Sequence, residues 1–135
     1  MDQKQPSFAV DCVVFDSKDR LLLIRRKNPP FQGQFALPGG FIDYGETTEQ
    51  AAARELLEET ALSATNLTLI GVYSEPNRDP RRHVVSVAYL VSVAHYDARA
   101  GDDAADATFV ANWREERLAF DHHKIVQDAR ALLEK

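Results

Sequence analysis

The sequence has few of the residues that cross-link secreted proteins or span membranes. Cys12 is its single cysteine, which excludes an internal disulfide and fits a reducing compartment. No stretch approaches the roughly 20 apolar residues that a membrane-spanning helix needs, and the N-terminal MDQKQPSF lacks the apolar core of a signal peptide. These absences predict a cytoplasmic protein without a membrane partner, in which Cys12 is an inert core thiol.

The chain also lacks an excess of positive charge. Its 16 Lys and Arg residues are outnumbered by 21 Asp and Glu residues, for a formal net charge of -5. This balance argues against nonspecific binding to nucleic acid or anionic membranes, although a local basic cluster still suits a small phosphate ligand. With 135 residues, 44% of them hydrophobic, the chain suits one cored domain and is too short for two. We therefore predict a single domain over residues 1–135.

The periodicity of apolar residues predicts an α/β fold. Two β-rich runs separated by a polar turn are typical of a hairpin. These and the further elements that we expect are strands at residues 8–15, 21–26, 35–37, 67–73, 83–93 and 108–113, and helices at 48–60 and 122–134. Strands on both sides of one helix, followed by a closing helix, predict a mixed α/β sandwich.

Both predicted helices carry end signals and an apolar stripe. Thr47 and Gln50 are spaced as a capping box, and Asp121 suits the N-cap of the second helix. The residues that we expect to be buried are Ala53, Leu56, Leu57 and Thr60 in the first helix, and Ile125, Val126, Ala129, Leu132 and Leu133 in the second.

Three carboxylates share one face of the first helix. At roughly 100° per residue, Glu58 lies about 60° to one side of Glu55 and Glu59 about 40° to the other. Like charges at these spacings each destabilise a helix by about 0.2–0.5 kcal/mol. A solvated acidic face is the simple alternative, but an oxygen-loving cation such as Mg²⁺ converts this repulsion into binding.

The spacing of these acids carries a family resemblance. Gly40, five residues, Glu46, seven residues, and then Arg54-Glu55-Leu56-x-Glu58-Glu59 resemble the Nudix box of hydrolases that act on nucleoside diphosphate derivatives. The resemblance implies an α-β-α sandwich with a mixed sheet, the box helix packed on that sheet, and Mg²⁺, with Mn²⁺ as the alternative cofactor. Glu55, Glu58 and Glu59, with Gly40, are the implied metal ligands.

Two other box residues have supporting roles in this interpretation. Arg54 orients a carboxylate through its bidentate guanidinium, and Glu46 braces the loop rather than binding metal. Ala61 stands where the family usually has Gly. Because a residue just past a helix end often adopts the left-handed conformation, we expect Ala61→Gly to stabilise or quicken the protein.

Residues outside the box point to a substrate. Arg78, Arg81 and Arg82 form a basic cluster suited to a phosphate group, with a solvated basic loop as the alternative. Residues 27–41, 78–90 and 113–129 resemble segments of bacterial ADP-ribose pyrophosphatases, which implies conversion of ADP-ribose and water to AMP and ribose 5-phosphate. The remaining candidate substrate contacts are Gly39, Gly40, Tyr44 and Phe31.

The general base has four acidic candidates, Asp102, Asp103, Asp106 and Glu75. For each of them singly, a solvated loop position is the favoured alternative, because a general base needs reach to the attacking water. Trp113 and Phe109 are predicted to pack in the core rather than to stack on adenine. His122 and His123 are predicted to lie at the surface of a helix start, because adjacent helical positions diverge by about 100°.

Two other functions stay open at this point. A hydrolase of (8-oxo-)dNTPs that cleans the nucleotide pool differs by releasing pyrophosphate from a triphosphate. An ADP-ribose-binding sensor domain releases nothing; the intact box and the short chain, without an appended DNA-binding domain, argue against it. Family analogy favours a homodimer.

Overall fold

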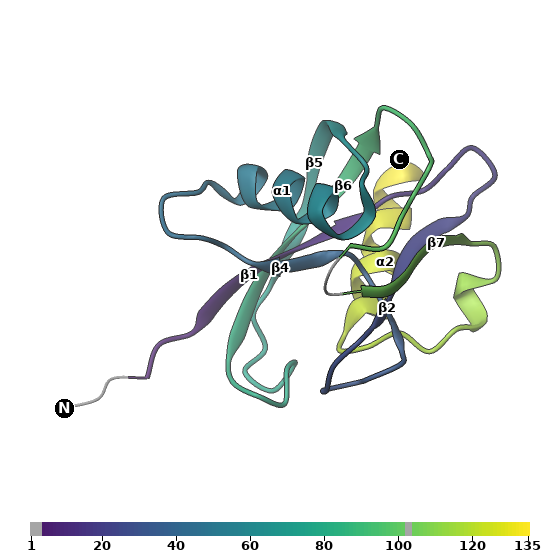
Figure 1. Ribbon diagram of the computed structural model, residues 1–135. Coiled ribbons are helices and arrows are strands. Elements are labelled where there is room, and N and C mark those ends of the chain that lie inside the picture. Colours follow the sequence, from purple (N-terminus) through teal and green to yellow (C-terminus); the bar gives the residue numbers. More distant parts are fainter. Residues whose placement is uncertain (1–3, 102–103) are drawn as a thin grey trace.

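The computed structural model describes residues 4–101 and 104–135 and arranges them in three layers (Figure 1). The elements in chain order are β1 (Ser7–Val13), β2 (Leu21–Arg26), β3 (Phe35–Ala36), β4 (Gly39–Phe41), α1 (Thr48–Thr60), β5 (Ala64–Tyr73), β6 (Val84–Val93), β7 (Ala104–Val110), the 3₁₀ helix Trp113–Glu115 and α2 (His122–Leu133). The two α-helices enclose the strands, which confirms the predicted α-β-α sandwich. None of the helices within the described residues is long and apolar enough to cross a membrane.

The strands form two sheets. The four-stranded sheet has the order β4-β1-β6-β5, and the three-stranded sheet has the order β3-β2-β7. The first is mixed, because β1 runs parallel to β6 and antiparallel to β4. One apolar cluster lies between this sheet and α1, and a second packs α2 against the strands.

The hairpin predicted for residues 8–15 and 21–26 has the expected turn, but the two strands do not pair with each other along their length. Val14 O accepts from Leu22 N at 2.9 Å, so the chain reverses as expected. However, β1 then pairs with β4 and β6, while β2 pairs with β3 and β7. The physical reason is burial on both faces, because Val10, Cys12 and Val13 are fully buried and a central strand needs a neighbour on each edge.

Helix α1 has the predicted bounds and the predicted cap. Thr47 Oγ1 accepts from Gln50 N at 3.0 Å, and Gln50 Oε1 accepts from Thr47 N at 2.9 Å. The predicted apolar stripe is partly wrong, because Leu57 is 52% exposed whereas Glu59 is buried. The helix is rotated so that its small residues Ala51 and Ala52 meet the sheet.

Ala61 ends α1 in the left-handed conformation, with φ 64° and ψ 13°. This conformation is strained for a residue with a Cβ atom, so we expect Ala61→Gly to raise the free energy of unfolding by about 1 kcal/mol. Urea denaturation measures the change. Ala53→Gly, inside the same helix, is the control and has the opposite expected sign, with a loss of about 1 kcal/mol. Destabilisation by Ala61→Gly contradicts the assigned helix end.

Helix α2 departs from its sequence interpretation at both ends. Asp121 precedes the helix but makes no capping hydrogen bond; its carboxylate instead accepts from Arg78 Nε at 2.9 Å and Nη2 at 2.6 Å. Ile125, Val126 and Ala129 are buried as predicted, whereas the prediction for Leu133 is wrong, because it is 49% exposed. The strand predicted at 108–113 lies earlier in the chain, as β7.

Candidate active site

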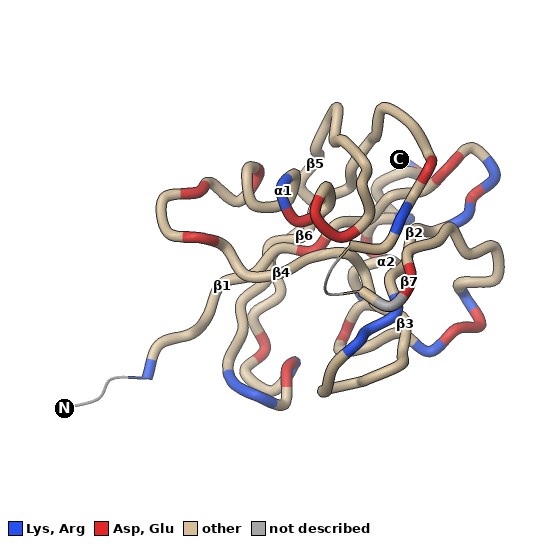
Figure 2. The backbone as a smooth tube through the Cα atoms, in the orientation of Figure 1, with Lys and Arg blue, Asp and Glu red and all other residues tan. Residues whose placement is uncertain are grey.

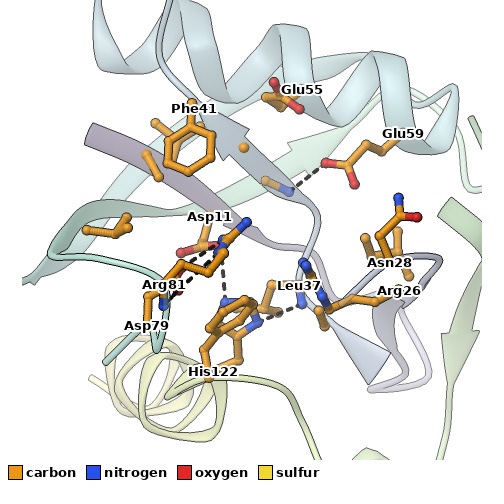
Figure 3. Close-up of a pocket in the computed structure, with 18 of the residues that line it drawn as sticks. Asp11, Arg26, Asn28, Leu37, Phe41, Glu55, Glu59, Asp79, Arg81 and His122 are labelled. Atoms are coloured by element: carbon orange, nitrogen blue, oxygen red, sulfur yellow. Dashed lines mark hydrogen bonds and ion pairs between the residues drawn. The ribbon is translucent and has the colours of Figure 1, made fainter. Parts of the chain in front are cut away.

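A cleft of about 460 Å³ opens where β1, β2 and β4, the C-terminal half of α1 and the start of α2 meet. Figure 2 shows acidic positions along α1 and basic positions at the end of β2. The polar and aromatic residues that line it are Asp11, Arg26, Lys27, Asn28, Phe41, Asp43, Glu55, Glu59, Arg78, Asp79, Arg81, Phe120 and His122. Most of them are labelled in Figure 3.

Two carboxylates of α1 form one wall of the cleft. Glu59 is 6% exposed, and its Oε1 accepts from Gly39 N at 2.8 Å. The Glu55 carboxylate lies directly over Gly40, where an added Cβ atom would be 2.5 Å from Glu55 Cδ. Burial, together with the charges of Glu55 and Asp11, raises the pKa of Glu59 to about 8, although the Gly39 hydrogen bond opposes the shift. Burial and Glu58 also raise the pKa of Glu55, against the opposing effect of Arg54.

Glu58, the third predicted metal ligand, does not line the cleft. Its side chain is 58% exposed and lies 3.3 Å from Arg54 Nη1. No three His, Cys, Asp or Glu side chains among the described residues surround a common point as a preformed metal site. The structure therefore brings Glu55 and Glu59 together at Gly39 and Gly40 and leaves Glu58 at the rim.

Arg54 connects the box residues. Its Nε and Nη2 donate to the two oxygens of Glu46 at 2.6 and 2.9 Å, and its Nη1 donates to Glu55 at 2.8 Å. Glu46 also accepts from Asp43 N at 2.8 Å. These bonds lower the pKa of Glu46 to about 2 and raise that of Arg54. The predicted bidentate grip is present, and Glu46 braces the loop before α1.

The arginines of residues 78–82 occupy three different environments. Arg78 is almost fully buried and pairs with Asp121. Arg81 lines the cleft, and its Nη2 donates to Asp79 at 2.7 Å. Arg82 is exposed, and its guanidinium carbon lies 5.2 Å from the centre of the Phe41 ring. The guanidinium carbon of Arg81 also lies 5.8 Å from the centre of the Phe41 ring, so Arg81 and Arg82 lie beside the same ring, whereas Arg78 is buried against Asp121.

Arg26 is a cleft residue that sequence reasoning missed. Its Nε donates to Pro30 O at 2.7 Å, and its guanidinium carbon lies 5.0 Å from the centre of the Phe120 ring. Within the described part of the chain, no residue accepts from its two terminal amino groups. Burial and the charge of Arg81 lower the pKa of Arg26. The signal in the sequence that could have indicated Arg26 is a positively charged residue just after the apolar run 21–24.

Comparison with known protein families identifies the family of this chain. A family model described as NUDIX domain matches residues 5–134. The chain belongs to the NUDIX domain family.

Known relatives divide between enzymes and regulators. This Nudix domain is 49% identical to an ADP-ribose pyrophosphatase of Methanocaldococcus jannaschii, over 91% of this chain and 72% of that protein. It is 31% identical to the ADPR responsive transcriptional repressor NtrR of Acinetobacter baylyi, of whose length it spans only 56%. The solved Nudix domain of Shewanella oneidensis NrtR complexed with ADP ribose has a TM-score of 0.90 and 32% identity, covering 97% of this chain and 90% of that one.

Two predicted substrate contacts lie outside the cleft of this Nudix domain. Tyr44 is fully exposed. Phe31 packs edge-to-face on Phe120 with ring centres 4.8 Å apart, so it supports a lining residue and does not itself line the cleft. Gly39 and Gly40 do line it, as predicted.

Neither of the two candidate general bases within the described residues lies in the cleft of the Nudix domain. Glu75 and Asp106 are exposed and do not line it. Asp102 and Asp103 lie outside the described residues, so their candidacy stays a prediction.

Other aromatic and polar predictions have clear outcomes. Trp113 is buried, with its ring centre 5.6 Å from that of Phe15, which confirms core packing. Phe109 packs against the cluster under α1, and Cys12 is buried with its pKa raised by burial and by Asp11. The surface position predicted for His122 is wrong, because its side chain is 4% exposed and bonded on both ring nitrogens.

Proposed function

We propose that this Nudix domain hydrolyses the pyrophosphate bond of ADP-ribose, giving AMP and ribose 5-phosphate, with Mg²⁺ or Mn²⁺ as cofactor. The observation that carries the proposal is the opposition of charge across the cleft, with Glu55 and Glu59 on one wall and Arg26 and Arg81 among its other lining residues. A diphosphate with a bound metal ion suits both sets of residues, because the cation suits the carboxylates and the phosphates suit the arginines. The likeness to the archaeal ADP-ribose pyrophosphatase supports the choice of substrate.

The donor set fits a hard divalent cation. Glu55, Glu58 and Glu59 supply carboxylate oxygens, the ligands that Mg²⁺ prefers, and the Gly40 carbonyl is the remaining proposed ligand. A bound divalent cation neutralises developing charge, orients phosphates and makes water more acidic. The raised pKa values of Glu55, which is partly buried, and Glu59, which is buried, indicate two carboxyls that repel each other when both are ionised.

Binding of the cation is expected to depend on pH through Glu59. Because its pKa in the folded protein is about 8 against an ordinary value of 4.5, the folded state holds the extra proton between these values. The metal-free protein therefore loses stability as pH rises through this window. Metal requires the ionised form, so the rise in melting temperature with Mg²⁺ should be larger at pH 8.5 than at pH 6. An equal rise at both values contradicts this; Glu59→Gln is the control that removes the dependence.

Arg26 is the proposed phosphate contact, because it lines the cleft and none of the described residues accepts from its terminal amino groups. Arg26→Ala should raise KM for ADP-ribose by about tenfold or more, since a hydrogen bond to a charged group contributes about 1.5–3 kcal/mol. The neighbouring Arg25→Ala is the matched control, because Arg25 donates to Gly33 O and does not line the cleft. Equal KM values for the two variants contradict the assignment.

Two rival functions are distinguished by their products. The sensor alternative is supported by the likeness to an ADPR responsive transcriptional repressor and to a Nudix domain solved with ADP ribose, and the nucleotide-pool hydrolase remains the rival enzyme. In a side-by-side assay with Mg²⁺, ADP-ribose should be turned over far faster than 8-oxo-dGTP or any dNTP. Faster release of pyrophosphate from a triphosphate overturns the proposal, as does binding of ADP-ribose without cleavage.

A homodimer is part of the proposal, and location in the cytoplasm stays a prediction. Phe8, Leu69 and Val72 are each more than half exposed, and strand alternation puts them on the sheet face that α1 only partly covers. Exposed apolar patches often mark subunit contacts. Light scattering after size exclusion distinguishes a dimer from a monomer of 15.1 kDa.

A further inference from the structure

A buried polar network forms part of the cleft lining, where sequence-distant segments meet (Figure 3). Ser86 Oγ donates to Asp11 Oδ2 at 2.5 Å, and His122 Nε2 lies 3.3 Å from Asp11 Oδ1. Arg78 Nη2 is 3.8 Å from the same carboxylate. Asp11 is therefore an acceptor with fixed partners.

The hydrogen bonds of His122 determine its protonation pattern. Its Nδ1 lies 3.0 Å from Leu37 N, and because a backbone N–H only donates, this ring nitrogen is an acceptor without a proton. The proton of the neutral ring is then on Nε2, which faces Asp11. Both ring nitrogens are used within the protein, so neither is available to bind metal or to take a proton from water.

The segment that His122 holds also holds Glu59. Leu37 N donates to His122, and two residues later Gly39 N donates to Glu59 Oε1 at 2.8 Å. Asp11 supports the same segment, because a Cβ atom on Gly39 would be 2.7 Å from Asp11 Oδ1. Residues 37–39 are thus tied to the start of α2 and, through Glu59, to the end of α1.

We infer that His122, oriented by Asp11, is a positioning residue for the metal-binding carboxylate Glu59. It fixes Leu37 N, which fixes Gly39 N, which in turn fixes one oxygen of Glu59. The inference rests on the proposed role of Glu59 as a metal ligand. Residues that orient metal ligands typically change metal affinity or activity by about 10–100-fold when replaced, although they touch neither metal nor substrate.

The test compares His122→Ala, His122→Asn and His123→Ala in Mn²⁺ affinity and steady-state kinetics. We expect His122→Ala to weaken Mn²⁺ binding and kcat by about tenfold or more, with KM for ADP-ribose changed by less than about twofold. The Asn side chain places its oxygen near the position of Nδ1, so His122→Asn should recover most of both losses. His123 makes a different contact, in which its Nε2 donates to Glu116 O at 2.7 Å, so His123→Ala should change neither Mn²⁺ affinity nor kcat.

Three results overturn the inference. The first is wild-type Mn²⁺ affinity in a folded His122→Ala variant, and the second is a folded His122→Asn variant no better than His122→Ala. The third is a ¹⁵N NMR signal showing a proton on Nδ1 of His122 in the wild-type protein. If His122→Ala does not fold, His122→Asn decides, because near-normal affinity supports the inference and a large loss refutes it. Glu59→Gln separates the two claims, since unchanged Mn²⁺ affinity in that variant refutes the metal site itself.

Discussion

Glu59→Gln should reduce the turnover of ADP-ribose by at least about 10²–10³-fold, the scale seen when one group that stabilises a transition state is removed, while the fold stays intact. Gln retains the size of the side chain and an oxygen that accepts from Gly39 N, but it lacks the charge that holds a cation. Because a buried, repelled carboxylate is removed, the metal-free variant should also unfold at higher temperature than wild type at pH 8.5. AMP release and circular dichroism measure the two effects.

Two comparisons sharpen this expectation. Glu49→Gln, at an exposed position in the first turn of the same helix, should retain wild-type activity. Glu58→Gln tests the ligand that the structure places at the rim, and we expect it to lose activity by orders of magnitude as well. Near-normal metal-dependent hydrolysis by both Glu58→Gln and Glu59→Gln contradicts the assigned metal face.

Gly40→Ala should lower kcat by about 100-fold, the loss that a displacement of about 1 Å in a reacting group produces. The added Cβ atom would meet the Glu55 carboxylate at 2.5–2.7 Å. The obstructing atoms are the end of a flexible side chain, so the protein folds and Glu55 moves away from the cleft. Steady-state AMP release at saturating Mg²⁺ measures the loss.

A glycine elsewhere in the mixed sheet provides the control for this substitution. A Cβ atom on Gly71 would have its nearest neighbour at 3.6 Å, which is an ordinary contact. Gly71→Ala should therefore keep both stability and activity. Full activity in Gly40→Ala would show that the position of Glu55 over Gly40 is unimportant for the reaction.

Local signals predicted the box helix well. The capping box of Thr47 and Gln50 and the start and end of α1 depend on residues within a few positions of each other. The rotation of the helix about its axis was less predictable. Because the small residues Ala51 and Ala52 pack on the sheet, Leu57 is exposed and Glu59 is buried, the reverse of the expected pattern.

The parts of the site that sequence reasoning missed are made by distant segments. Arg26 faces the cleft only because β2 lies in the second sheet. His122 is buried where Leu37 N donates to its Nδ1 and the Asp11 carboxylate faces its Nε2. The basic cluster of Arg78, Arg81 and Arg82 was visible in sequence. Its division between ion pairs with Asp121 and Asp79 depends on tertiary structure.

The most direct test of the proposed function is product analysis of ADP-ribose incubated with the wild-type protein, with Mg²⁺ and with EDTA. The opposed charges of Glu59 and Arg26 across the cleft predict AMP and ribose 5-phosphate in equal amounts with Mg²⁺, and neither product with EDTA. Cleavage that is undiminished by EDTA, or tight binding of ADP-ribose with no AMP formed in Mg²⁺, would contradict the proposal.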